Sequence, residues 1–180
     1  IIPSSVTSIG SSAFEACYYL ERLTIPASVI SIGTGIVSLC SSLTSLVVNE
    51  NNNVYYSEGN CIITKSDKVV IAGCESSIIP EGVSTIGSYA FEWCDLESIT
   101  IPKGVTSIGN YAFYGCSLTS ITLPAGLTNI GDYAFYYCTN LTSITLPDGL
   151  TSVGDSAFEE CYWLSNITLP LELTYIGENA

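Results

Sequence analysis

The 180-residue chain contains no histidine and no methionine, and only Arg22, Lys65, Lys68 and Lys103 carry positive side chains. Without histidine, a histidine-based catalytic triad and a metalloprotease motif are excluded, and no glycine-rich phosphate loop is present. The 17 carboxylates leave a net charge of −13. A surface that neutralises phosphates needs clustered Lys and Arg, so the sequence argues against nucleic acid and anionic membrane surfaces as partners.

Long apolar runs are also missing. Apolar residues make up 47% of the chain, which is too many for a disordered protein. No run approaches the roughly 18 to 20 residues that a membrane-spanning helix needs, and no segment resembles a signal peptide. We therefore predict no membrane insertion. The lack of an initial methionine and of polar terminal caps leads us to expect a fragment of a longer array.

Seven prolines divide the chain at intervals of 23, 54, 22, 22, 23 and 23 residues. A glycine follows each proline by seven residues, and an aliphatic residue precedes each of these glycines. A phenylalanine follows five of the prolines by eleven residues. A cysteine follows six of them by fourteen residues, at Cys17, Cys40, Cys94, Cys116, Cys138 and Cys161. These coincidences indicate one structural unit that repeats every 22 to 23 residues.

Each unit predicts a strand, a turn, a second short strand and a further turn. In one unit, Leu118, Ile121 and Leu123 fit the L-x-x-L-x-L core of leucine-rich repeats, and the last two alternate with polar residues as in a half-buried strand. Proline then ends the strand. We expect the repeat glycine to supply a positive φ, and a capping residue such as Asn110 to start a short helical turn. A single unit buries too little to fold alone, so the coils must stack.

The unit LPxGLTSIGDYAFYxCxxLTSIT resembles the BspA-like leucine-rich repeat, and the resemblance covers residues 1–180. It implies a leucine-rich-repeat solenoid, a right-handed β/α superhelix with one main stack of parallel strands and a short second strand in each coil. It also implies a secreted or surface-attached protein that functions in adhesion. The expected partner is a protein or glycan of the host matrix or of another microbe.

The 54-residue interval contains one repeat and an insertion. The β-rich segments 61–64 and 69–72 flank a polar turn, which predicts a β-hairpin insertion at about residues 49–75. The insertion is either a structural elaboration of one coil or a binding device; the first reading is favoured. We predict that the chain is otherwise one array over residues 1–180.

The cysteine pattern does not favour metal or disulfide chemistry. Side chains of adjacent coils point the same way and no C-x-x-C pair occurs, so we expect the cysteine column to be buried thiols. A turn at Ser66–Asp67 places Cys61 opposite Ala72, which disfavours a Cys61–Cys74 bond without excluding it. Asp132, Asp155 and Glu178 form an acidic column, for which helix capping is favoured over calcium. No cofactor and no metal site are predicted.

Two exposed surfaces are candidate binding sites. The outward positions of the main strands are small and polar, at Ser120, Thr122, Ser143 and Thr145. The turn side carries rows of aromatic residues, including Tyr111, Tyr114, Tyr133, Tyr136 and Tyr137. Tyrosine is common at binding hot spots, although these rings could equally pack between coils. Carboxylate pairs such as Glu159 and Glu160 fit solvated charge, so we predict a non-catalytic binding or adhesion module. The alternative is a structural spacer.

Overall fold

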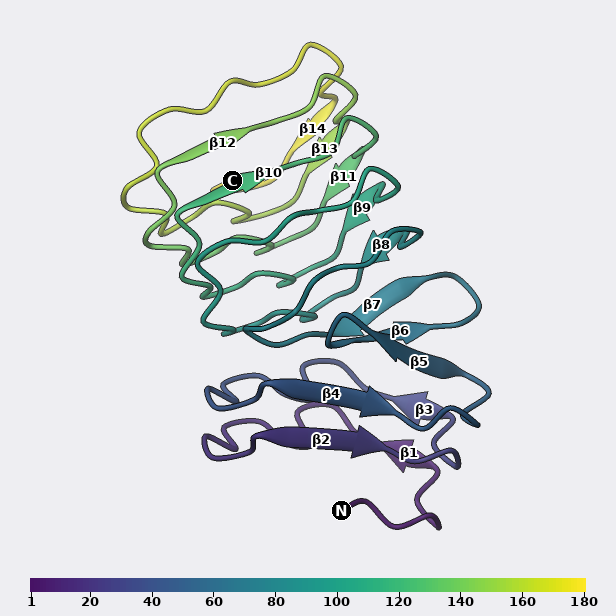
Figure 1. Ribbon diagram of the computed structural model, residues 1–180. Coiled ribbons are helices and arrows are strands. Elements are labelled where there is room, and N and C mark those ends of the chain that lie inside the picture. Colours follow the sequence, from purple (N-terminus) through teal and green to yellow (C-terminus); the bar gives the residue numbers. More distant parts are fainter.

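The computed structural model describes residues 1–180 as a stack of coils built from β-strands and turns, without an α-helix (Figure 1). The main strands are β2 (Arg22–Ile25), β4 (Ser45–Val48), β10 (Ser120–Thr122) and β12 (Ser143–Thr145). The short strands are β1 (Ser8–Ile9), β3 (Ser31–Ile32), β8 (Thr85–Ile86), β9 (Ser107–Ile108), β11 (Asn129–Ile130), β13 (Ser152–Val153) and β14 (Tyr175–Ile176). Between them lie β5 (Tyr55–Glu58), β6 (Cys61–Thr64) and β7 (Val69–Ala72).

Equivalent strands of successive coils pair in parallel, as the repeat predicts. Ser120 of β10 lies opposite Ser143 of β12, and Ile108 of β9 lies opposite Ile130 of β11. In each pair the partners occupy the same position of the repeat. Proline carbonyls then accept hydrogen bonds from the amide three residues later, for example Pro124 from Leu127 at 3.0 Å. The proline thus ends the main strand and begins a tight turn.

The core repeats with the same period. The rings of Phe91, Phe113, Phe135 and Phe158 stack along the axis with centroids 5.3 to 5.4 Å apart. Aromatic residues contribute large buried areas, so this column forms the centre of the larger hydrophobic core. That core comprises 31 buried residues, whereas a second core of 13 buried residues lies at the N-terminal side.

The predicted helical turns, and with them the β/α character of the superhelix, are wrong. Tyr111 and Gly115 have φ values of 58° and 68°, and Tyr133 and Tyr137 have φ values of 56° and 58°. Left-handed residues four positions apart cannot continue a right-handed helix. Their amides donate to the next coil instead, as Tyr133 does to the carbonyl of Asp155 at 2.8 Å. The turns therefore form a further hydrogen-bonded ladder along the axis.

The residues predicted to cap these helices also link coils. The Oδ1 atom of Asn110 accepts the amide of Asp132 at 3.0 Å, and Oδ1 of Asp132 accepts the amide of Asp155 at 3.0 Å. Oδ1 of Asp155 continues the row by accepting the amide of Glu178 at 2.9 Å. The carboxylates of Asp132 and Asp155 thus accept backbone amides of the next coil, which corrects the capping interpretation.

The repeat glycines allow adjacent coils to approach closely. They do not adopt the positive φ that we expected. Neither Gly131 nor Gly154 has a positive φ. A Cβ atom on Gly131 would lie 2.7 Å from the amide nitrogen of Asn110, and one on Gly154 would lie 2.5 Å from that of Asp132. Real Cβ atoms do not approach backbone so closely, so a larger residue would force adjacent coils apart.

The insertion is a three-stranded unit, one strand more than the hairpin that the sequence pattern suggests. β5 pairs antiparallel with β6, β6 pairs antiparallel with β7 through a bulge, and β7 pairs in parallel with β8. The bulge places Ile62 opposite Ala72, and Cys61 lies opposite Glu58. The expected pairing of Cys61 with Ala72 is therefore wrong by one residue. In Figure 1 the unit lies between β1–β4 and the remaining coils.

Alternate residues of this unit face different cores. Ile62 and Ala72 belong to the smaller core, whereas Cys61, Ile63 and Val70 belong to the larger one. Because successive side chains of a strand point to opposite faces, the unit forms a wall that is apolar on both sides. The insertion is therefore built into the stack and separates its two cores.

Candidate binding surfaces

The cysteine column is structural. The thiols of Cys116 and Cys138 donate to the carbonyls of Phe91 and Phe113 in the preceding coils at 3.1 and 3.2 Å. Burial raises the pKa of Cys161 to about 11 and that of Cys61 to about 12, so these groups stay neutral and are poor nucleophiles. We expected at least five of the six column cysteines to be buried, and this expectation is wrong, because three of them are not. Cys17 is exposed, and Cys40 and Cys94 are half-buried.

Cys61 and Cys74 are free thiols, and both are buried. Cys61 is fully buried and Cys74 is 2% exposed, which differs from the surface position that a projecting hairpin would give them. Cys61 contributes to the larger core and Cys74 to the smaller one. The two residues therefore belong to the packing of the wall.

The turn side of three successive coils gathers seven aromatic rings. Tyr89, Tyr111 and Tyr133 stack along the axis with centroids 4.7 Å apart and planes within 8° of parallel. The spacing between coils matches a good stacking distance, so residues at one position of the repeat form a continuous column. Both faces of the Tyr111 ring are consequently covered by its neighbours.

A second row of rings lies beside this column. The ring of Tyr114 is 5.8 Å from that of Tyr111 and almost perpendicular to it, at 87°. It also contacts Trp93 at 5.1 Å and Tyr136 at 5.3 Å. Tyr137 lies 5.7 Å from Trp93 and is 41% exposed. We call these seven residues the aromatic patch: Tyr89, Trp93, Tyr111, Tyr114, Tyr133, Tyr136 and Tyr137.

The tyrosines were interpreted either as exposed binding residues or as packing between coils, and in the structure they show features of both. Tyr111 and Tyr133 stack between coils, yet they and their neighbours Tyr114 and Tyr136 remain partly exposed. All five tyrosines predicted as candidate binding residues lie in the patch, together with Tyr89 and Trp93. Burial raises the pKa values of Tyr111, Tyr114 and Tyr136, with smaller contributions from nearby charges. Their hydroxyls are therefore neutral hydrogen-bonding groups.

The strand face is the second candidate surface. Ser120 and Thr122 of β10 and Ser143 and Thr145 of β12 are all exposed, next to one another across the pair. A shallow hollow that is open to solvent lies at the ends of these strands. Its lining includes Thr122, Leu123, Thr145, Leu146 and Pro147. A neighbouring hollow lies between Thr100 and Pro124. The sequence signal for these hollows is a threonine two residues before the repeat proline, as in Thr122–Pro124 and Thr145–Pro147.

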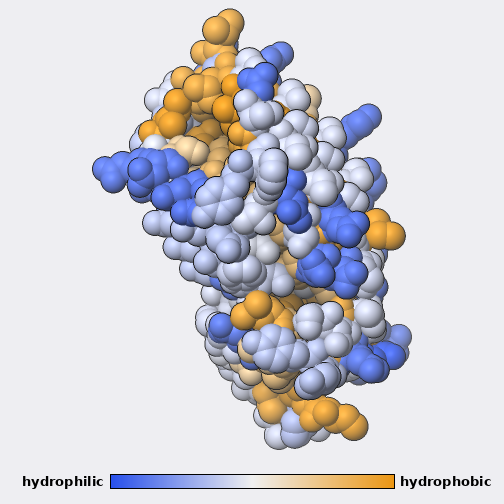
Figure 2. All heavy atoms as spheres, turned by 90° about the vertical axis from the view of Figure 1, so that its left-hand side faces the viewer, coloured by the Kyte–Doolittle hydropathy of each residue, from blue (hydrophilic) through white to orange (hydrophobic).

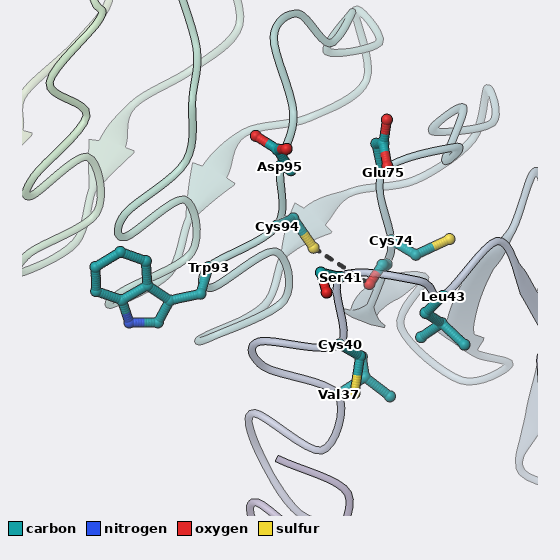
Figure 3. A pocket seen from close by; sticks show the side chains of 10 residues that line it. Val37, Cys40, Ser41, Leu43, Cys74, Glu75, Trp93, Cys94 and Asp95 are labelled. Carbon is teal, nitrogen blue, oxygen red and sulfur yellow. Dashed lines mark hydrogen bonds between the residues drawn. The ribbon is translucent and has the colours of Figure 1, made fainter. Parts of the chain in front are cut away.

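A narrow crevice marks the boundary between the N-terminal coils and the coil after the wall (Figure 3). Cys40, Cys74 and Cys94 line it together with Trp93 and the carboxylates Glu75 and Asp95. The thiol of Cys94 donates to the carbonyl of Gly73 at 3.6 Å, and burial raises its pKa. Burial, with a smaller contribution from the charge of Glu75, keeps the Cys94 thiol neutral, and a neutral thiol is a poor nucleophile.

No group of three or more Cys, Asp and Glu residues has a geometry that could hold a metal ion. The structure contains no helix that could cross a membrane. Glu159 and Glu160, weighed above as a carboxylate pair, are partly exposed on the turn next to the aromatic patch. The candidate surfaces are thus suited to contact and stacking.

Comparisons with known proteins agree with this repeat architecture. The family model for the BspA type leucine-rich repeat region matches residues 1–69 and 70–180, with six copies. A comparison with curated proteins finds no significant match.

Solved structures of bacterial proteins are similar over almost the whole chain. A leucine-rich repeat protein from Eubacterium ventriosum is 26% identical, with a TM-score of 0.66 over 99% of this chain and 63% of its own. A leucine-rich cell surface protein from Faecalibacterium prausnitzii is 33% identical, with a TM-score of 0.67 over 92% of this chain and 52% of its own. The pneumococcal vaccine antigen PcpA is 25% identical, with a TM-score of 0.69 over 98% of this chain and 46% of its own. The chain thus spans less than two thirds of each.

Proposed function

The chain belongs to the BspA-type leucine-rich repeat family, and from that premise we propose that it is a non-catalytic binding module that recognises a protein or glycan. The observation that carries the proposal is the aromatic patch. Seven rings from three coils lie on one face, and the second row includes the exposed Tyr137. A protein stabilised by its core alone does not require such a cluster at the surface.

We also propose that the module acts outside the cell or at the cell surface. One structural relative is a cell surface protein and another is a vaccine antigen. The surface position of the first of these relatives fits an adhesion role towards a host matrix or another microbe. The high negative charge keeps a repeat array of this kind soluble.

The aromatic patch is the favoured binding surface of the two. A tyrosine ring provides a large contact area at low entropic cost, whereas a single hydroxyl contributes about 1 kcal/mol or less to binding. The strand face of Ser120, Thr122, Ser143 and Thr145 supports the competing view, because Thr122 and Thr145 line the hollow at the strand ends. A spacer that displays another domain is the second candidate function, and the small, uniform strand face favours it.

Substitution of each surface tests the proposal against arrays of glycans and of extracellular matrix proteins. The first variant carries Tyr114→Ala, Tyr136→Ala and Tyr137→Ala, and the second carries Ser120→Ala, Thr122→Ala, Ser143→Ala and Thr145→Ala. For any ligand found, we expect the first variant to lose about 30-fold or more in affinity and the second to lose little. Circular dichroism and thermal unfolding check that both variants fold.

The opposite result, in which only the strand-face variant loses affinity, would move the binding site to that face. Unchanged binding in both variants, or no ligand on either array, would favour the spacer. A variant with Tyr114→Phe and Tyr136→Phe separates the rings from their hydroxyls, because it keeps the stacking surface.

We propose further that residues 1–180 form one array in which the insertion is a structural element. The parallel pairing of β7 with β8 and the two apolar faces of the wall support this reading. The alternative use of the insertion as a binding device would require exposed anchors, yet Ile62 and Ile63 are fully buried.

A further inference from the structure

Carboxylates surround the aromatic patch. Glu92 lies in the same turn as Trp93, and its charge is among the causes that raise the pKa of Tyr114, after burial. Glu160 and Glu159 contribute in the same way at Tyr136, again after burial, and Asp132 contributes at Tyr111. The rings are therefore bordered by negative charge on both sides along the solenoid axis.

The positive residues of the chain lie elsewhere. Arg22 is on β2, Lys65 and Lys68 are in the turn between β6 and β7, and Lys103 follows Pro102 at the strand side. Two of them already have partners: Nζ of Lys65 donates to the carbonyl of Asn52 at 2.6 Å, and Nζ of Lys68 lies 5.0 Å from the centre of the Tyr56 ring. The patch thus has a negative potential that no neighbouring cation offsets.

The most exposed ring of the patch, Tyr137, belongs to its second row, where it stacks on Tyr136 at 6.5 Å and 20°. Stacking covers both faces of Tyr111, but the near-perpendicular Tyr114 and the tilted Tyr136 are oriented differently from that column. The face of an aromatic ring carries negative charge density and attracts ammonium and guanidinium groups within about 6 Å of its centre. Ring faces and carboxylates therefore both favour a ligand with ammonium or guanidinium groups.

We propose that the aromatic patch is a docking surface for an extended Lys- and Arg-rich segment of a partner polypeptide. The cationic side chains lie over Tyr114, Tyr136 and Tyr137, and Glu92, Glu159 and Glu160 pair with those at the edges. The proposal rests on the binding function proposed above and names the partner's chemistry. An extended segment suits a surface that spans three coils and has no deep pocket.

Charge distinguishes this partner from a glycan. Neutral sugars also stack on tyrosine and can donate hydroxyl hydrogen bonds to carboxylates, but they form no ion pair, and acidic polysaccharides are repelled by the carboxylates. A basic segment uses both features, so its affinity depends on the rings and on the charges together. This double dependence makes the proposal testable.

The test measures the fluorescence anisotropy of a short labelled peptide of alternating Lys and Ser on the full chain. One variant carries Tyr114→Leu and Tyr136→Leu, which removes two rings, retains apolar bulk and leaves the net charge unchanged. Another carries Glu159→Gln and Glu160→Gln. The matched control carries Asp148→Asn and Glu172→Gln, which removes two exposed carboxylates elsewhere.

We expect both patch variants to weaken binding about 10-fold and the control to weaken it less than about 3-fold. Tyr114→Phe with Tyr136→Phe should bind as the parent does, and circular dichroism verifies the fold of each variant. Equal losses in the two charge variants with no loss in the Leu variant would show non-specific attraction to an acidic protein and overturn the proposal. Absence of peptide binding would overturn it as well.

The general binding function has a separate readout. If the peptide does not bind but a glycan or matrix protein binds with dependence on the tyrosines, only the basic partner is wrong. If nothing binds to any surface of the array, the proposed function fails together with this inference.

Discussion

At the scale of single residues, the left-handed backbone positions carry unusually large side chains. Tyr111, Tyr133, Trp93 and Tyr137 all have positive φ, a conformation that costs a non-glycine residue about 1 to 2 kcal/mol. The stacked rings of the aromatic patch offset this cost. At the position equivalent to Trp93 and Tyr137, the middle coil has Gly115, and the Trp93 ring occupies the space of its missing side chain.

Gly115→Ala should therefore destabilise the protein. The added Cβ would lie 2.4 Å from Cε3 of Trp93, and we expect a loss of about 1 to 3 kcal/mol in the free energy of unfolding, measured in urea. Gly126→Ala is the matched control, because its Cβ would meet only the carbonyl of Lys103 at an ordinary 3.5 Å. That variant should be neutral or up to about 1 kcal/mol more stable. Similar losses at both positions would contradict the close contact.

The buried thiols predict a loss of stability at alkaline pH. Burial raises the pKa of Cys61 from 9.0 to about 12, so the folded state favours the protonated thiol. Its contribution is complete below pH 9.0 and disappears as the pH rises towards 12, by about 1.4 kcal/mol per pH unit in that window. Cys61→Ala should flatten the fall of unfolding free energy between pH 9 and 11.

The slopes are compared and not the absolute stabilities, because Cys61→Ala also leaves a cavity. Cys17→Ala removes an exposed thiol and should follow the parent slope. If Cys61→Ala keeps the parent slope too, ionisation of this thiol does not contribute to the alkaline loss.

At the scale of elements, the repeat strands were largely predictable from the sequence, whereas the turns and strand β5 were not. Strands follow from alternation, as in Ile121 and Leu123, and from the proline that ends them. The turn residues led to a wrong prediction of helical turns because Asn and Asp side chains can either cap a helix or accept a hydrogen bond from a neighbouring coil. Asn110 and Asp132 are good helix caps, but in a stack they can bond to the equivalent residue one coil away. Whether such a side chain accepts an amide of its own turn or one of the next coil depends on how the coils stack, which the local sequence does not show.

The candidate surfaces show the same limit. The period placed Tyr111, Tyr114, Tyr133 and Tyr136 in rows, and those rows exist in the structure. Whether the rings stack or face solvent depends on their orientation, and the repeat pattern alone does not predict that orientation. The β5 strand was missed because Tyr55–Glu58 follows a run of asparagines that is typical of a loop.

One of those asparagines anchors the wall to the preceding coil. The side chain of Asn52 is fully buried; its Nδ2 donates to the carbonyls of Pro26 and Val29 at 3.0 and 2.8 Å. Its Oδ1 accepts the amides of Val54 and Tyr55 at 2.9 and 2.8 Å. The amide thus uses both of its hydrogen-bonding ends to fix the entry into β5.

We expect Asn52→Ala to lower the free energy of unfolding by about 2 to 5 kcal/mol, because buried carbonyls and amides lose their partner. Asn52→Asp should be similarly damaging, since a carboxylate cannot donate to the carbonyls of Pro26 and Val29. Asn53→Ala, at an exposed neighbouring position, is the control. Urea unfolding measures all three, and an undamaged Asn52→Ala protein would show that the loop does not depend on this anchor.

At the scale of the whole molecule, the wall divides a repeat protein that would otherwise have one continuous core. Hydrophobic side chains gather at both ends of the molecule and in a band near its middle (Figure 2). The two cores are joined through the strands of the wall, and across the turn side Oγ of Ser38 donates to Oε2 of Glu92 at 2.5 Å. In a stacked array each unit is stabilised mainly by its neighbours, so a change in the interface weakens cooperativity at that point.

This division predicts that unfolding in urea has two steps, with the smaller core melting first. Leu46→Ala removes a buried side chain from the 13-residue core, and Leu127→Ala removes one from the 31-residue core. Each should cost about 2 to 5 kcal/mol, but in a different transition. Leu46→Ala should shift only the first step, seen as early loss of protection in hydrogen exchange over β1–β4. Leu127→Ala should shift the second, seen as loss of protection in hydrogen exchange over β9–β13. A single transition that both variants shift equally would mean that the wall couples the two cores as tightly as one coil couples to the next.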